Sequence, residues 1–110
     1  MEALVKGDIV IFPFPYTDLS NTKMRPCLVL SNEMKEDILL CQITSKNSAK
    51  DDFAVELKKS ETDSGSLMID SYIRTNMLFT ANKQQIVRVA CKLRKQKYVE
   101  VVNKIIKLVE

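Results

Sequence analysis

Arg25 is the side chain whose position in the sequence points most clearly to chemistry. Pro26 follows it and restricts Arg25 to an extended conformation, which predicts that Arg25 occupies the first position of a strand. A polar stretch that includes Asp18 and Lys23 lies just before it. A guanidinium presents a planar fork of donors that fits a phosphate, and it stays charged at any working pH. The alternative is an ordinary surface arginine paired with a carboxylate.

Two further groups of polar residues follow runs of strand-forming residues. Thr44 and Ser45 end one run, and Arg74 and Asn76 follow another. Taken alone, hydroxyls at a strand end often only cap the next turn, and an amide beside an arginine often only completes one. Together with Arg25, these groups add a second guanidinium and two hydroxyls, but none of these signals is specific alone.

Composition excludes several other chemistries. None of the 110 residues is a histidine, which removes His general bases, Ser-His and Cys-His pairs and histidine metal sites. The two glycines, Gly7 and Gly65, cannot build a Walker loop or a GxGxxG turn. The three cysteines, Cys27, Cys41 and Cys91, are too far apart for a zinc knuckle and have apolar neighbours, so we expect buried, reduced thiols. We therefore expect neither a metal nor a cofactor.

The overall composition is that of one small globular domain. Hydrophobic residues make up 45% and charged residues 28% of the chain, which predicts a single domain over residues 1–110 with one real core. The net charge of +3 permits a polyanionic partner without requiring one. The N-terminal residues are too polar for a signal peptide and no apolar run is long enough for a membrane span, so we expect a cytoplasmic protein.

Apolar periodicity predicts many short strands and one terminal helix. The expected strands cover residues 8–14, 25–31, 37–44, 53–57, 67–74 and 86–93, with a helical turn over 80–85 that Thr80 or Asn82 caps. Pro13 and Pro15 predict an edge or a bulge at the end of the first strand. The last strand is expected to place Val87, Val89, Cys91 and Leu93 on one face, and the helix is expected over 95–108. These elements predict an α+β domain in which a compact barrel-like sheet packs against the helix.

Three blocks of sequence together resemble the PemK/MazF-type toxins of type II toxin–antitoxin systems. The first and most specific is GDIVIFPFPYTDLSNTKMRPCLVLSN (residues 7–32), in which a Gly-Asp start and a hydrophobic strand lead through a polar loop to a basic-Arg-Pro strand entry. The second is ILLCQITSK, where the family has Thr or Ser at the strand end. The third is SYIRTNMLFTANKQQI (residues 71–86), similar to the family's Ser-x-(Ile/Val)-Arg-x-Asp segment. The likeness spans nearly the whole chain.

The resemblance implies a small SH3-like barrel with a helix, and metal-independent, sequence-specific cleavage of single-stranded RNA that leaves a 2′,3′-cyclic phosphate and a 5′-hydroxyl. Matched by motif, Arg25 and Thr44 are catalytic residues and Arg74 is a further active-site arginine. Asn76 departs from the family pattern, because it stands where a catalytic Asp is found and an amide cannot accept a proton. Substrate contacts are expected from Asp18, Lys23 and Ser45. The proton acceptor is left open among Asp18, Asp70 and water.

The resemblance also implies three partners: a second copy of the chain in a homodimer, single-stranded RNA and a cognate antitoxin. Operator DNA is expected to be bound only through the antitoxin. An acidic antitoxin segment is expected to cross the RNA groove, because arginines attract carboxylates as well as phosphates. Two alternatives remain. One is a non-catalytic toxin of the same fold that inhibits a protein target such as gyrase, as CcdB relatives do. The other is a catalytically weakened remnant that binds only RNA and antitoxin.

Overall fold

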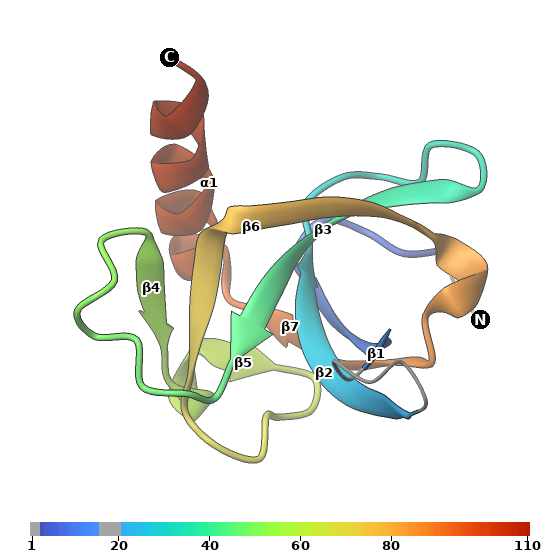
Figure 1. Cartoon of the computed structure of the whole chain (residues 1–110), viewed down its shortest axis with the longest axis horizontal. Coiled ribbons are helices and arrows are strands. Elements are labelled where there is room, and N and C mark those ends of the chain that lie inside the picture. The colour runs from blue at the N-terminus through green and yellow to red at the C-terminus, as the bar shows by residue number, and fades with distance from the viewer. Residues whose placement is uncertain (1–2, 16–20) are drawn as a thin grey trace.

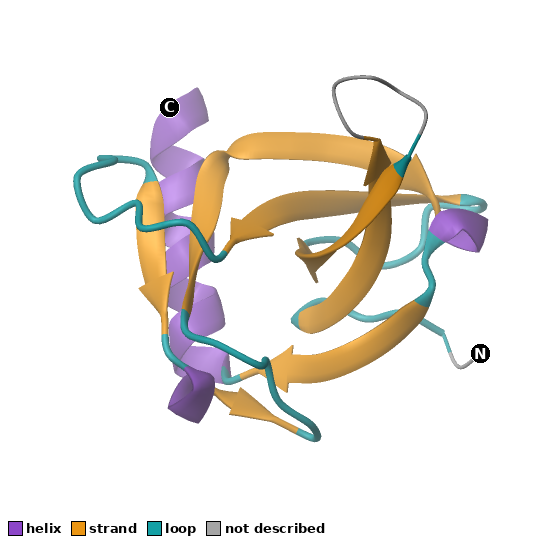
Figure 2. Cartoon of the chain, turned by 60° about the horizontal axis from the view of Figure 1, so that its bottom comes forward, coloured by secondary structure: helices purple, strands orange, loops and turns teal. Residues whose placement is uncertain are grey.

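A curled antiparallel sheet and one long helix form the part of the chain that the structure describes, residues 3–15 and 21–110 of a computed structural model (Figure 1). The strands are β1 (Asp8–Pro15), β2 (Thr22–Val29), β3 (Asp37–Thr44), β4 (Ala54–Leu57), β5 (Thr62–Asp63), β6 (Ser71–Asn82) and β7 (Arg88–Leu93), and the helix is α1 (Lys95–Val109). Across the sheet the strand order is β4-β6-β3-β2-β1-β7-β5. The predicted α+β fold is confirmed, and Figure 2 shows how strongly the sheet curls.

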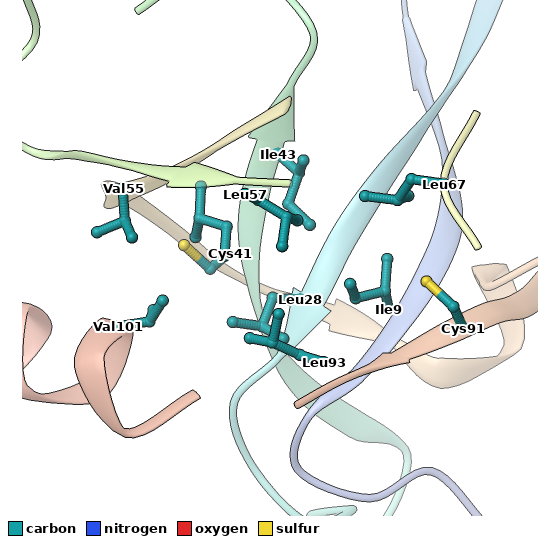
Figure 3. Close-up of a cluster of buried hydrophobic side chains, with 11 residues drawn as sticks. Ile9, Leu28, Cys41, Ile43, Val55, Leu57, Leu67, Cys91, Leu93 and Val101 are labelled. Atoms are coloured by element: carbon teal, nitrogen blue, oxygen red, sulfur yellow. The ribbon is translucent and has the colours of Figure 1, made fainter. Parts of the chain in front are cut away.

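The strands in the middle of the sheet are buried on both faces. Leu28 of β2 packs into one apolar cluster with Cys41, whereas its neighbours Cys27 and Val29 pack into a second cluster. Figure 3 shows the first cluster, which Val101 of α1 joins from the helix side. Burial on both faces explains why the sequence of β2 after its proline is an unbroken apolar run. All three cysteines are free thiols in these buried positions, as predicted.

β1 pairs with a strand on both sides only over its first half. It pairs with β2 from Ile9 to Pro15 but with β7 only from Asp8 to Ile11. Pro13 therefore lies beyond the end of the β7 ladder, where its missing N–H group leaves no ladder bond unmade. The predicted edge position of the two prolines agrees with this arrangement.

β6 departs most from the predicted strands. In place of a strand over 67–74 and a helical turn over 80–85, one strand runs from Ser71 to Asn82 and a 3-10 helix, Lys83–Gln85, follows it. The strand turns a corner, because its register against β3 jumps from Ile73 opposite Ile43 to Leu78 opposite Cys41. The first half also pairs with β4, so one strand serves two parts of the sheet (Figure 1). Asn82, one of the two predicted caps, accepts a hydrogen bond from Gln84 N at 2.8 Å.

β7 contains a bulge that breaks the predicted alternation. Val10 lies opposite Val89 and Ile9 lies opposite Cys91, so Ala90 is an extra residue in the ladder. As a result Cys91 is buried while Val89 is 38% exposed. The prediction that Val89 and Cys91 lie on one face is therefore wrong. Val87, predicted to lie on the same face as Cys91, is exposed as well.

The remaining elements differ little from the prediction. The helix begins at the predicted residue and ends one residue later than predicted, at Val109. The expected loop over 58–66 also contains a 3-10 helix, Lys59–Glu61, and the two-residue strand β5, which pairs with β7. No helix among residues 3–15 and 21–110 is both long and apolar enough to cross a membrane.

Candidate functional site

Arg25 lies inside β2, three residues after its start, and not at the first position as predicted. The strand begins earlier because its ladder with β1 continues through Lys23, opposite Phe14, to Thr22. Arg25 itself lies opposite Phe12 and is half-buried. A paired neighbour on the β1 side and the fixed φ of the following proline hold its backbone rigidly.

Thr44 ends β3, as predicted, and lies one strand away from Arg25. The β2–β3 ladder runs from Val29, opposite Leu40, to Cys27, opposite Gln42, and ends there, so Arg25 and Thr44 lie just beyond the end of this ladder. On its other side Thr44 pairs with Tyr72 of β6. Residues directly opposite each other share a face of the sheet. Thr44 and Tyr72 therefore share a face of the sheet.

The Thr44 hydroxyl combines the capping role with a possible ligand contact. Its Oγ1 accepts a hydrogen bond from Lys46 N at 3.1 Å, which is the strand-end cap considered above. A hydroxyl that accepts one bond still has its own hydrogen to donate. Thr44 is half-buried, so this donor points from a fixed position at the end of β3.

A hollow of about 590 Å³, here called the Thr44 hollow, brings Thr44 together with Arg74. Its walls are Thr44, Lys46, Asn47, Ser48, Ala49, Lys50, Asp51 and Arg74. Arg74 lies within β6, which continues past it, whereas the predicted strand ended at this residue. The Arg74 carbonyl accepts a hydrogen bond from Cys41 Sγ at 3.0 Å. The next residue, Thr75, is fully buried and donates from Oγ1 to the Phe53 carbonyl at 2.5 Å. These bonds fix the backbone that carries the guanidinium.

A second hollow of about 310 Å³, the Arg25 hollow, lies on the other side of the Thr44–Ser45 strand end. It is lined by Ile11, Lys23, Met24, Arg25, Pro26, Ile43, Ser45, Ser66, Leu67, Met68, Ile69, Ser71, Arg88 and Ala90. Ser45 lines this hollow and Thr44 lines the other, so the two hollows are neighbours. The structure thus places the predicted Arg25, Lys23 and Ser45 together, and it places Thr44 with Arg74.

The arginines of the two hollows lack carboxylate partners within the described part of the chain. Of the four arginines, only Arg94 has a described carboxylate oxygen within 4.0 Å, that of Asp63 at 3.2 Å. Among residues 3–15 and 21–110, Arg25, Arg74 and Arg88 have none. Within the described residues, the structure therefore gives no support to the alternative that Arg25 is a surface arginine paired with a carboxylate. Three guanidinium groups without a carboxylate partner in residues 3–15 and 21–110 attract an anion.

Two predicted residues of the described part of the chain do not join these hollows. Asn76 is exposed on β6 and lines neither hollow. Asp70 lines neither hollow and accepts a hydrogen bond from Lys59 N at 2.8 Å. Asp18 lies outside the described residues.

Asp51 and Arg88 line the hollows, and the sequence interpretation missed both. Asp51 faces the Thr44 hollow, and its Oδ1 accepts a hydrogen bond from Phe53 N at 2.9 Å. It stands in a polar loop with no motif around it, so only the fold reveals its neighbours. The predicted alternation of the last strand puts Arg88 on the face away from Val89 and Cys91, and the bulge at Ala90 has no sequence signal that would reveal it.

The thiols and carboxylates give no second type of reactive site. Burial raises the pKa of Cys27 and of Cys41 to about 12, so neither supplies a thiolate at neutral pH. Within the described residues, no group of three or more His, Cys, Asp or Glu side chains is placed to hold a metal ion. The fold and these hollows define a small barrel-like α+β protein with a basic, hydroxyl-lined surface.

The chain belongs to the family of PemK-like, MazF-like toxins of type II toxin–antitoxin systems, whose family model matches residues 5–109. No curated protein matches the sequence. Among solved structures, MazF (Form-I) from Deinococcus radiodurans is similar at 17% identity and a TM-score of 0.78, with 99% of this chain and 98% of that chain covered. A MazE-MazF complex (Form-III) from the same organism gives 18% identity and a TM-score of 0.77, with 98% and 97% covered. A mycobacterial endoribonuclease in complex with its cognate antitoxin gives 14% and 0.69, with 98% and 93% covered.

Proposed function

We propose that this protein is the toxin of a type II toxin–antitoxin system, and that its residues 1–110 form one cytoplasmic domain that cleaves single-stranded mRNA at a short sequence without a metal ion. The observation that carries the proposal is that Thr44 and Arg74 line one hollow and Arg25 lines the neighbouring hollow together with Ser45, in a chain of this toxin family. Cationic and hydroxyl groups at one strand end suit a phosphodiester better than any neutral substrate.

In the proposed reaction the ribose 2′-hydroxyl attacks the neighbouring phosphorus. A bond forms between the 2′-oxygen and phosphorus, the bond from phosphorus to the 5′-oxygen breaks, and the products are a 2′,3′-cyclic phosphate and a 5′-hydroxyl. Because the nucleophile belongs to the substrate, the protein needs to hold it in line and stabilise the phosphoryl charge. Arg25 and Arg74 supply the charge and Thr44 supplies a hydrogen bond.

Two protons move in this reaction. The attacking 2′-hydroxyl loses one and the departing 5′-oxygen gains one. Asp51 brings a carboxylate into the Thr44 hollow, with Oδ1 held by Phe53 N, and a held carboxylate of this kind can accept a proton through its second oxygen. Asn76 cannot take this role, because an amide does not accept a proton.

The proposed partners follow from the same surface. A homodimer would place two such basic sites on one assembly, and a cognate antitoxin would cover them with an acidic segment that competes with RNA. Operator DNA would then be bound only through the antitoxin. The similar structures with an antitoxin bound, from Deinococcus and from a mycobacterium, support this proposal.

A non-catalytic toxin of the same fold that inhibits a protein target is the second candidate. The amide at position 76 and the absence of histidine favour it, since both remove groups that transfer protons. Arg25, Arg74 and Arg88, which have no carboxylate within 4.0 Å among the described residues, favour a polyanionic substrate more strongly, and we therefore place RNA cleavage first.

The proposal is tested by incubating the purified protein with a long RNA in EDTA and mapping the 5′ ends of the fragments. We expect cuts at one short motif in single-stranded regions. Activity that requires an added divalent ion, or that is confined to duplex RNA, would contradict the proposal.

A further inference from the structure

Arg88 reaches the Arg25 hollow because of the bulge in β7. From the pairing of Ile9 with Cys91, a regular ladder would bring Val89 opposite Ile11 two residues later. The extra residue Ala90 shifts the register, and Arg88 lies opposite Ile11 instead. Ile11 and Arg88 both line the hollow. The bulge therefore places a guanidinium where an unbulged strand would place an apolar side chain, and bulges commonly re-aim side chains beside functional sites.

The bulge is held from outside by Gly65. A Cβ added at this residue would lie 2.2 Å from the Ala90 carbonyl oxygen, and the glycine has φ of +125°, a conformation that other residues rarely adopt. Just before it, Asp63 of β5 pairs with Lys92 of β7, which keeps this loop against the strand. Only a glycine fits this close approach, so any other residue there must displace the bulge.

The chemistry of the hollow suits one nucleotide. Its cations are Lys23, Arg25 and Arg88, its hydroxyls include those of Ser45 and Ser66, and the remainder of its wall is mainly aliphatic. A volume of about 310 Å³ lies at the lower end of the range for small-ligand sites and accommodates one base. No carboxylate of the described residues lies within 4.0 Å of Arg88.

We propose that Arg88 binds a phosphate of the RNA substrate next to the phosphate held by Arg25, and that a base beside this phosphate occupies the Arg25 hollow. The inference rests on the proposed function and adds to it a residue and a nucleotide subsite. RNA is favoured over an acidic peptide because the hollow shares Arg25 with the reacting centre. A base that enters it would select the sequence that is cut.

The test measures binding of a single-stranded RNA that contains the cleavage motif and carries 2′-O-methyl groups, so that it cannot react. Arg88→Ala is expected to weaken binding about tenfold or more, as for a lost charge-assisted contact. The slope of log Kd against log salt concentration should fall in magnitude by about 0.7, the value for one phosphate contact on a single strand. The matched control is Arg94→Ala, since Arg94 is exposed, paired with Asp63 and outside both hollows. It should change neither quantity.

A second variant tests the role of the bulge in positioning. Gly65→Ala should weaken RNA binding in the same direction as Arg88→Ala, and the double variant should bind no worse than the weaker single variant, because both act on one contact. Thermal unfolding of each variant separates this effect from a loss of the fold. Arg88→Lys should keep the salt slope but bind more weakly than the native protein, because an ammonium lacks the bidentate fork.

The outcomes separate this inference from the function on which it rests. If the native protein neither binds nor cuts RNA, both fail. If it cuts RNA and folded Arg88→Ala matches Arg94→Ala in Kd and salt slope, only the inference is overturned. Weakened binding of the antitoxin with unchanged RNA binding would also overturn it, by assigning the hollow to a peptide.

Discussion

At the scale of single residues, the site depends on arginines held in the middle of strands. Arg25 pairs with Phe12 of β1 and is followed by a proline. The Arg74 carbonyl accepts a hydrogen bond from Cys41 Sγ, and the next residue, Thr75, donates one to the Phe53 carbonyl. A backbone held by these bonds fixes the point from which each guanidinium reaches a ligand, which helps to hold a phosphate in a reactive geometry.

Replacing Arg25 tests the residue at the centre of this account. Arg25→Ala should lower the rate of RNA cleavage about a hundredfold or more, since it removes a charge that stabilises the transition state. The free energy of unfolding should change by about 1 kcal/mol or less, as expected away from the core. Single-turnover cleavage and urea unfolding measure the two quantities. Arg94→Ala is again the control, and a folded Arg25→Ala protein with native activity would remove Arg25 from the site.

Thr44→Val should cause a smaller but clear loss of rate. The substitution keeps the shape of the side chain and removes both the cap to Lys46 N and the donor proposed to face the phosphate. If thermal stability drops while the cleavage rate per folded molecule is unchanged, Thr44 only caps the strand end.

A substitution at Asn76 is expected to raise the cleavage rate, unlike those at Arg25 and Thr44. Asn76→Asp places a carboxylate two residues from Arg74 on β6, and the positive charge favours its ionised form. We expect a faster single-turnover reaction and a new acidic limb in the pH–rate profile, where the native protein shows no titration of this residue. A slower reaction with unchanged RNA binding would mean that the amide orients a group and that a carboxylate at position 76 does not accept the proton.

At the scale of elements, Glu33 joins three segments around the N-terminal end of β1. Its carboxylate accepts hydrogen bonds from Leu4 N at 2.8 Å and from Lys83 Nζ at 2.7 Å. The bond from Lys83, followed by the bond from Leu4 N, lowers the pKa of Glu33, and the same bond raises the pKa of Lys83. The segment before β1 is thus tied to the 3-10 helix after β6.

The lowered pKa predicts a dependence of stability on pH. A carboxylate whose pKa is lower in the folded state adds stability above its unfolded pKa, and this stability is lost as the pH falls through the folded value. Glu33→Gln should therefore destabilise the protein at pH 7, and the difference in melting temperature from the native protein should shrink below about pH 4.5. A difference that stays constant from pH 7 to pH 3 would show that ionisation of Glu33 does not contribute.

Some of the helices and strands could be predicted from the sequence and others could not. Periodicity was sufficient for β3 and α1, whose patterns are regular and whose ends carry polar residues. It was insufficient for β6 and β7, since a corner and a bulge add residues that break the period of two without any composition of their own. The candidate site divides in the same way. Motif positions predicted Arg25, Thr44 and Arg74, whereas Arg88 and Asp51 could not be predicted, because only long-range contacts bring them to their hollows.

At the scale of the whole molecule, one short curled sheet offers only shallow hollows, and we expect the working form to be a homodimer. Large apolar side chains remain exposed on α1, among them Val99, Ile106 and Val109. Apolar groups that are exposed together often mark an interface. Sedimentation equilibrium at micromolar concentration should give twice the mass of the chain, and a monomer under these conditions would contradict the expectation.

The antitoxin should compete with RNA, because the arginines attract carboxylates as well as phosphates. A complex with the cognate antitoxin is expected to lose binding of the non-reactive RNA, and to regain it when the acidic segment of the antitoxin is removed. Fluorescence anisotropy of labelled RNA measures both. A complex that binds RNA as tightly as the free toxin would place the antitoxin elsewhere on the molecule.

The central claim is that the substrate's own 2′-hydroxyl attacks a phosphate held by Arg25, Arg74 and Thr44. The most direct measurement uses two RNA oligonucleotides that differ only by a 2′-deoxy group at the nucleotide before the cut, incubated with the protein in EDTA and analysed by mass spectrometry. The account predicts that the all-ribose RNA gives a 2′,3′-cyclic phosphate and a 5′-hydroxyl, and that the deoxy RNA stays intact although it binds. Cleavage of the deoxy RNA at the same position, or products with a 5′-phosphate, would contradict it.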